Sequence, residues 1–212
     1  MILVVAAEKG GVGKSTIALN LAVHLAVNDV DLVLVDTDTQ RTCAQFVDRR
    51  DEAGIKPRIH CIQRTGNVAN TLRDLDTKHQ VVIVDAGGRD SIEMRSAATV
   101  AQLMLVPTGA SQPDLETMPR VNEIIKTAKV YNPNLQAFAV LSMASPNPLV
   151  SETTEAQDLL QEFSEMHLAD TVIRSRQIYK RAMADGIGVV ETDHGQAKAE
   201  IQLLAQEFID LE

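Results

Sequence analysis

The chain has 212 residues, 45% hydrophobic and 23% charged, so it can bury a full core and does not have the composition of a disordered protein. Its formal net charge of −9 excludes a generally basic nucleic-acid binder, although a local basic patch remains compatible with it. No apolar run approaches the roughly 18 residues that span a bilayer. Cys43 and Cys61 lack metal or redox spacing, and we expect reduced structural thiols in a cytoplasmic protein.

Apolar strand-like runs alternate with amphipathic helix-like segments along the whole chain. Several strand runs are continuous and β-branched, which is typical of strands buried on both faces of a parallel sheet. The alternation predicts a doubly wound α/β fold: a mostly parallel sheet flanked by helices, with ligand groups beyond the carboxyl ends of the strands. The expected strands are residues 2–6, 32–35, 58–62, 81–84, 103–106, 138–141 and 171–173, and the expected helices include 15–27, 67–75, 115–130 and 151–163.

A glycine-rich segment, EKGGVGKST, follows directly behind the first expected strand. Its glycines let backbone N–H groups converge on anionic oxygens, and the helix that begins near Lys14 adds its positive amino-terminal end. Lys14 can reach the β- and γ-phosphates, and the Ser15 hydroxyl can ligate Mg²⁺. The segment therefore predicts a site for a nucleoside triphosphate with magnesium. The predicted nucleotide-binding residues here are Lys9, Gly10, Gly11, Val12, Gly13, Lys14, Ser15 and Thr16.

The motif departs from the general phosphate-binding pattern G-x-x-x-x-G-K-[ST]. Glu8 stands where that pattern has glycine, and a second lysine, Lys9, follows it. The sequence K-G-G-x-G-K-[ST] resembles the deviant P-loop of the ParA/MinD superfamily, which contains partition ATPases, division-site ATPases and the nitrogenase iron protein. The resemblance implies that Lys9 crosses a dimer interface to touch the partner's nucleotide, while Lys14 acts in cis. The alternative for Lys9 is a solvated loop lysine.

Aspartates close two of the expected strands. Asp36 and Asp38 follow the second strand, and Asp85 follows the fourth. A hard cation prefers oxygen ligands, and a carboxylate at a strand tip faces the ligand crevice. The resemblance implies that Asp38 orients the attacking water, that Asp36 and Asp85 help to hold magnesium, and that residues 87–88 form a flexible switch. The alternative for each aspartate is a helix N-cap or a turn residue. The predicted catalytic residues are thus Lys9, Lys14 and Asp38, and the predicted metal-site residues are Ser15, Asp36 and Asp85.

The sequence gives less information about the base. It contains no N-K-x-D segment, the motif that reads guanine in many GTPases, and this favours ATP. The stretch beginning at Pro107 resembles the superfamily's P-x-x-x-S-x-x-D-L loop, so Pro107 is a candidate contact to the nucleotide. Residues 145–148 are a second candidate loop.

The carboxyl-terminal segment helps to distinguish which branch of the superfamily the chain resembles. Residues 200–212 have helical periodicity, but their charges include Glu200 and Glu207, so an anionic membrane would repel them. We expect a closing helix of the core and no membrane partner. Cys43 and Cys61 are not placed for the cluster of a nitrogenase iron protein. The chain begins at its first strand, so we expect a single P-loop domain over 1–212 without an N-terminal DNA-binding domain, as in short ParA-type (ParF-like) partition ATPases.

The densest positive cluster lies in a closing segment similar to that of small partition ATPases. It comprises Arg174, Arg176, Lys180 and Arg181, and a dimer could present it to the phosphates of duplex DNA without sequence preference. The alternative is a solvated helix face.

The resemblance implies a slow, dimer-coupled ATPase for DNA segregation. An ATP-bound homodimer would bind nonspecific double-stranded DNA, and a centromere-binding ParB-type partner would stimulate hydrolysis and release it. The protein would be cytoplasmic and associated with the nucleoid when ATP is bound. One alternative is a switch of the same type that positions a protein cargo, and another is a metabolic ATP-dependent ligase.

Overall fold

The computed structural model describes residues 1–88, 90–147 and 152–209. Within them, seven strands form one sheet in the order β3-β2-β4-β1-β5-β6-β7, and every pairing is parallel. The doubly wound α/β prediction is confirmed, with a sheet that is parallel throughout these residues. The strands are β1 (Ile2–Val5), β2 (Leu32–Asp36), β3 (His60–Gln63), β4 (Val81–Asp85), β5 (Leu103–Thr108), β6 (Gln136–Leu141) and β7 (His167–Leu168).

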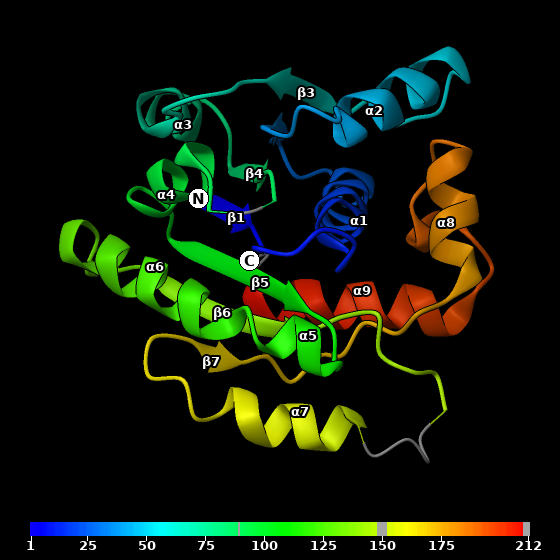
Figure 1. Cartoon of the computed structure of the whole chain (residues 1–212). Helices are drawn as coiled ribbons and strands as arrows, with labels where there is room; N and C mark the ends of the chain where they lie inside the picture. Colours follow the sequence, from blue (N-terminus) through cyan, green and yellow to red (C-terminus); the bar gives the residue numbers. More distant parts are fainter. Residues whose placement is uncertain (89, 148–151, 210–212) are drawn as a thin grey trace.

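Helices cover both faces of the sheet, and each face has its own apolar core. One core joins the sheet to α1, α2, α8 and α9, and the other joins it to α3, α4, α6 and α7. Figure 1 shows α3, α4 and α6 on one side of the strands, with α1, α2 and α8 on the other. The helices are α1 (Lys14–Val27), α2 (Thr42–Glu52), α3 (Ala69–Asp76), α4 (Ile92–Ala98), α5 (Gln112–Leu115), α6 (Met118–Tyr131), α7 (Glu152–Leu160), α8 (Gln177–Ala184), the 3₁₀ turn η1 (Val189–Glu191) and α9 (Gly195–Phe208).

Two expected elements differ from the structure. The helix expected over 115–130 is divided into α5 and α6, and Pro119 lies in the first turn of α6, where its missing N–H costs no hydrogen bond. The strand expected over 171–173 is wrong, because the last strand is β7. The N–H groups of Asp170 and Thr171 donate to the Glu207 carboxylate of α9 at 2.7 and 3.0 Å, so they have a side-chain partner in place of a strand partner.

The register of the sheet brings the predicted carboxylates together. Val5, at the end of β1, is paired with Asp85, and Asp36, at the end of β2, is paired with the same Asp85. The loop that follows β1 therefore begins beside both aspartates. This juxtaposition follows from the parallel strands, whose carboxyl ends meet at one edge.

The closing helix α9 packs against the core, as expected from its periodicity. Ile201 and Leu204 are fully buried on its inner face, and the Phe208 ring lies 4.6 Å from the Phe138 ring between centroids. Glu200 is also buried, which the sequence analysis did not foresee. Residues 210–212 of the expected tail lie outside the described part. Among the described residues, no helix combines the length and apolar character needed to cross a membrane.

Candidate nucleotide-binding site

The loop between β1 and α1 has the geometry of an anion cradle. Gly11 and Gly13 adopt φ values of 83° and 89°, a region that other residues rarely enter. A Cβ on Gly13 would lie only 2.7 Å from the Ser142 hydroxyl oxygen, whereas a Cβ on Gly10 or Gly11 would meet no atom within 4 Å. Gly13 caps α1 without a side-chain hydrogen bond, so the first-turn N–H groups of α1 are open to an external anion.

The cis lysine is enclosed between two loops. Lys14 is 7% exposed, and a Cβ on Gly88 would lie 3.4 Å from its ammonium nitrogen. Gly88 belongs to the segment after β4 that was predicted to form a flexible switch. Lys14 thus connects the P-loop to that segment, and a buried ammonium in this position offers strong charge stabilisation to a phosphate.

Asp85 has one oxygen free for a ligand. It is fully buried, and its Oδ2 accepts a hydrogen bond from the Cys43 thiol at 3.1 Å, while its Oδ1 has no partner among the described atoms. Burial raises the pKa of Asp85 to about 6, although the nearby Ser15 and Cys43 side chains lower it in part. A buried oxygen without a partner, next to the Ser15 hydroxyl, fits the hydration shell of Mg²⁺.

The thiol beside Asp85 is the contact that sequence reasoning missed. Cys43 was expected to be an isolated structural thiol. The sequence signal that could have predicted its contact with Asp85 is its position in α2, shortly after a strand that ends in aspartate. Burial, together with the neighbouring carboxylates Asp85 and Asp36, raises the pKa of Cys43 well above its usual value. The thiol therefore stays protonated and acts as a hydrogen-bond donor.

The loop after β2 is fixed by backbone contacts. The two oxygens of Asp36 accept from the N–H groups of Asp38 at 3.1 Å and Ala44 at 3.0 Å, so this buried carboxylate anchors the loop and the start of α2. Thr37 donates its hydroxyl to the Asp85 carbonyl and accepts from the Gly87 N–H, both at 3.1 Å. Thr37 therefore links the loop after β2 to the predicted switch at residues 87–88.

Asp38 is the half-buried carboxylate of this loop. Its Oδ1 accepts a hydrogen bond from the Gln40 N–H at 2.9 Å. Gly87 lies beside it, because a Cβ on Gly87 would be 3.8 Å from the Asp38 carboxyl carbon. Asp38 and the glycines after β4 thus face each other across the site.

Lys9 contacts its own chain. Its ammonium lies 2.5 Å from the Asp114 Oδ1 in α5, and the lysine side chain is 38% exposed. The preceding Glu8 forms an ion pair with Arg120 of α6 at 3.0 Å, and Arg120 also contacts Asp90 at 3.2 Å. The departure from the general P-loop pattern at Glu8 thus ties the loop to α6 and to the segment after β4.

A cavity of about 250 Å³ adjoins the P-loop, and neither Asp38 nor residues 87–88 line it. Pro107 does not line it: this residue is buried within β5, where it is paired with Val140. The second candidate loop does not line it through its described residues either, and Pro148 lies outside them. The lining comprises Gly11, Gly13, Lys14, Ser15, Thr16, Thr42, Ser142, Met143, Ile173, Arg174, Ser175, Arg176, Tyr179, Lys180 and Met183.

A larger cavity, of about 820 Å³, lies between α5 and α7. Its lining includes four glutamates and contains no lysine or arginine: the acidic members are Glu116, Glu152, Glu155 and Glu162. Such a lining repels a triphosphate. The smaller cavity beside the P-loop is therefore the better candidate for the nucleotide site. Within residues 1–88, 90–147 and 152–209, no group of three or more acidic, histidine or cysteine side chains could hold a metal ion alone.

The predicted DNA-binding cluster is not a uniform positive surface. Arg176 donates to the buried Glu200 at 2.9 and 3.0 Å, and only 14% of its side chain is exposed. Arg174 lies 3.8 Å from the same carboxylate. A cation that neutralises a buried carboxylate is less available to DNA phosphate, so the role expected of Arg176 stays a prediction that this pairing weakens. Lys180 and Arg181 are exposed.

Comparisons with known proteins agree with this geometry. The CobQ/CobB/MinD/ParA nucleotide binding domain (CbiA) matches residues 3–189. The "Maintenance of carboxysome distribution protein A" of Halothiobacillus neapolitanus is 31% identical over 196 residues, which is 89% of this chain and 86% of the relative. The chromosome-partitioning ATPase Soj of Thermus thermophilus is 25% identical over 184 residues, 73% of this chain and 74% of the relative.

Solved structures show the same fold. Apo McdA of Cyanothece has a TM-score of 0.79 at 16% identity, over 97% of this chain and 98% of that one. The family match extends over most of the chain, and the resemblance seen in the P-loop sequence is confirmed. The chain belongs to the CobQ/CobB/MinD/ParA family of nucleotide-binding domains and, within it, is a P-loop protein of the ParA/MinD type.

Proposed function

We propose that this protein is a magnesium-dependent ATPase that acts as a dimeric switch and positions a protein cargo. The nucleotide part rests on the anion cradle at Gly11 and Gly13, the enclosed Lys14 and the cavity beside them. The cargo part rests on one observation, the 31% identity to a carboxysome distribution protein across most of both chains.

The proposed reaction is hydrolysis of ATP to ADP and phosphate. Water attacks the γ-phosphorus, and the bond from that phosphorus to the bridging oxygen breaks. Asp38 orients the water, while Lys14 and the N-terminus of α1 stabilise charge on the phosphate oxygens. Ser15 and Asp85 would hold Mg²⁺, which supplies further positive charge when bound.

Lys9 makes the proposed reaction depend on dimerisation. If Lys9 reaches the nucleotide of a second copy, ATP bridges two chains and hydrolysis separates them. Charge stabilisation is then complete only in the dimer, so turnover is slow in the isolated chain. This dependence makes the protein a switch rather than a metabolic catalyst.

The cargo is the point on which this proposal differs from the DNA-segregation hypothesis. A protein named ParA and a chromosome-partitioning ATPase are also among the relatives, at lower coverage of this chain. The pairing of Arg176 with Glu200 makes one of the four cations that the DNA hypothesis used less available. The coverage favours a protein cargo, whereas the Arg176 pairing bears only on how the switch would contact DNA.

The test is removal of the gene from the cells that carry it, with imaging of the large protein assemblies of the cell and a plasmid-retention assay. We expect protein assemblies to cluster while plasmid inheritance stays normal, and wild-type complementation to restore their spacing. Plasmid loss with normally spaced assemblies would favour DNA segregation and contradict the proposal.

A second test uses purified protein. Binding to random-sequence duplex DNA is measured with ATP–Mg²⁺ and with ADP across a salt series. ATP-dependent binding that weakens steeply with salt would identify DNA as the surface on which the switch moves. No binding in either state would make a protein scaffold that surface.

A further inference from the structure

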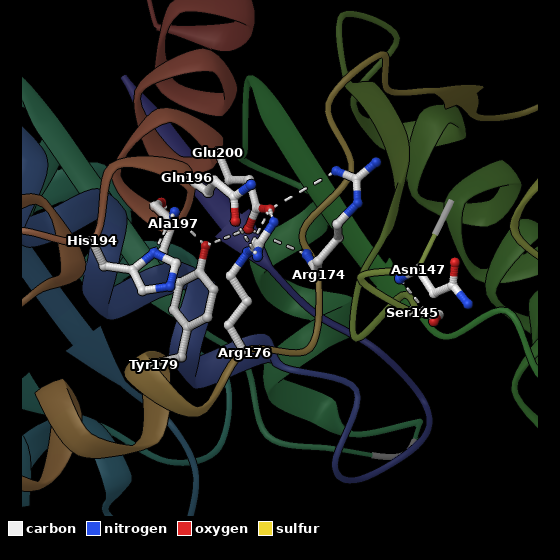
Figure 2. A network of polar contacts seen from close by, with 9 residues as sticks. All are labelled: Ser145, Asn147, Arg174, Arg176, Tyr179, His194, Gln196, Ala197 and Glu200. Atoms are coloured by element: carbon white, nitrogen blue, oxygen red, sulfur yellow. Dashed lines mark hydrogen bonds and ion pairs between the residues drawn. The ribbon is translucent and has the colours of Figure 1, made fainter. Parts of the chain in front are cut away.

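One carboxylate of the closing helix holds together a wall of the nucleotide cavity. Glu200 of α9 is 6% exposed, and its Oε1 accepts from the Arg176 guanidinium at 2.9 and 3.0 Å. Its Oε2 accepts from the Tyr179 hydroxyl at 3.0 Å and from the Arg174 N–H at 3.3 Å. Figure 2 shows these groups converging on Glu200.

Each of these three donors belongs to a residue that lines the cavity beside the P-loop. Two further lining residues, Ser142 and Met143, belong to a segment joined to the same wall by backbone contacts, since the Ser175 N–H donates to the Ala144 carbonyl at 2.8 Å. Glu200 itself does not line this cavity. It therefore acts on the cavity through the residues that it binds.

The cavity has a phosphate end and a nucleoside end. In the proposed function the triphosphate ends between the P-loop, Asp38 and Gly87, and the last two residues do not line the cavity. A nucleoside attached to those phosphates would then occupy the rest of the cavity, whose lining includes Arg176 and Tyr179. That wall is the part of the site that Glu200 fixes.

We propose that Glu200 is a positioning residue that fixes the nucleoside-side wall of the ATP site by binding Arg174, Arg176 and Tyr179. This inference rests on the proposed nucleotide binding. A planar guanidinium held in one orientation offers a surface on which a base can stack. Gln196 strengthens the arrangement, because its Oε1 accepts from the Arg176 guanidinium at 2.7 Å.

The charge of Glu200 is needed for this role. The two carboxylate oxygens of Glu200 both accept hydrogen bonds, whereas a glutamine offers one oxygen and turns an N–H toward the same donors. Burial beside Glu200 raises the pKa of Tyr179, so the tyrosine hydroxyl remains protonated and donates. Replacing Glu200 with glutamine therefore loosens the wall without introducing a larger side chain.

The test compares two ligands that share phosphates and differ in the nucleoside. Binding of ATP and of inorganic tripolyphosphate, each with Mg²⁺, is measured by calorimetry for the wild type and for Glu200→Gln. We expect ATP affinity to fall about tenfold, as for loss of charged hydrogen bonds, while tripolyphosphate affinity stays within about twofold. A structural defect would lower both.

Glu207→Gln is the matched control. Glu207 lies on the same helix and also accepts backbone N–H groups, those of Asp170 and Thr171, but neither it nor these residues line the nucleotide cavity. We expect this variant to bind both ligands as the wild type does. Equal losses of ATP affinity in Glu200→Gln and Glu207→Gln would overturn the inference, as would unchanged ATP affinity in Glu200→Gln.

A milder variant covers the case in which Glu200→Gln fails to fold. Tyr179→Phe keeps the ring and removes one donor to Glu200. We expect a smaller loss for ATP, about threefold, with tripolyphosphate unchanged. Equal effects on both ligands would contradict the inference. If the wild type binds neither ligand, the proposed function itself is wrong, which is distinct from an ATP-binding protein that does not need Glu200.

Discussion

The ammonium of Lys9 lies 2.5 Å from the Oδ1 of Asp114 in the same chain. Although burial raises the pKa of Asp114, hydrogen bonds from Lys9 and Ser111 lower it below the usual value, so the pair is charged near neutral pH. In this conformation Lys9 is satisfied within its own chain. Contact with the nucleotide of a second copy requires that this ion pair be broken.

Lys9→Ala should leave ATP binding largely intact and remove ATP-dependent dimerisation. The reason is that Lys14 and the P-loop backbone form the cis site, while only Lys9 is expected to act across the interface. Sedimentation with ATP–Mg²⁺ measures the association, and nucleotide binding is measured in parallel. A variant that dimerises like the wild type would show that Lys9 does not act in trans.

Asp114→Asn should have the opposite effect on association. The Lys9–Asp114 pair is partly exposed, and such a pair is worth about 1 kcal/mol or less. Its loss frees Lys9, so we expect ATP-dependent dimers at up to about fivefold lower protein concentration. Weaker dimerisation would mean that Asp114 instead prepares Lys9 for the interface.

Asp38→Ala should abolish hydrolysis while retaining ATP, because the attacking water loses the group that orients it. We expect turnover to fall at least about a hundredfold, in line with general-base and positioning effects. ATP should then accumulate in the dimeric protein. Phosphate release and sedimentation report the two quantities, and Lys14→Ala, which should bind no ATP, is the contrasting variant. Unchanged phosphate release would remove Asp38 from the mechanism.

Asp85 should make the nucleotide-free protein less stable as the pH rises. Its pKa is about 6 in the folded chain against an ordinary 3.8, so the folded state binds the proton more tightly than the unfolded state. The stabilisation is complete below pH 3.8 and is lost as the pH rises to about 6.

Asp85→Asn should remove this dependence. The comparison is made in EDTA and without nucleotide. Between about pH 4 and about pH 6, the unfolding free energy of the variant should rise relative to that of the wild type by roughly 1–3 kcal/mol. Above about pH 6 this difference should stay constant. Urea unfolding across this range measures it. A difference that does not vary with pH would show that burial does not perturb Asp85.

The buried Arg50–Glu191 pair should be a main contributor to stability. Arg50 is fully buried and forms two bonds to the Glu191 carboxylate, at 2.7 and 2.8 Å, and further bonds to two backbone carbonyls. Glu191→Gln leaves a buried guanidinium without its counter-charge, so we expect a loss of about 3 kcal/mol in unfolding free energy. Asp51→Asn, which breaks the exposed Arg58–Asp51 pair, should cost less than about 1 kcal/mol. Equal costs would contradict the argument from burial.

The P-loop and the parallel α/β fold class were predictable because the residues that determine them lie close together in the sequence. Gly13 needs positive φ, Lys14 opens a helix, and Asp36 and Asp85 end continuous apolar strands, each visible within a few residues. The failures lie where partners are distant in sequence. The strand expected over 171–173 did not form, since Thr171 is bound by Glu207, 36 residues away.

The sequence by itself therefore determined the anion cradle, the parallel sheet and the strand-end aspartates. The reason is that hydrophobic periodicity and glycine spacing determine the local structure of the few residues around them. Only the tertiary structure decided which charges are available. It buried Glu200 against Arg176, joined Cys43 to Asp85 and held Lys9 on Asp114. These pairings depend on how helices pack on the sheet, because the free energy of a charge is set by its burial and by its neighbours in space.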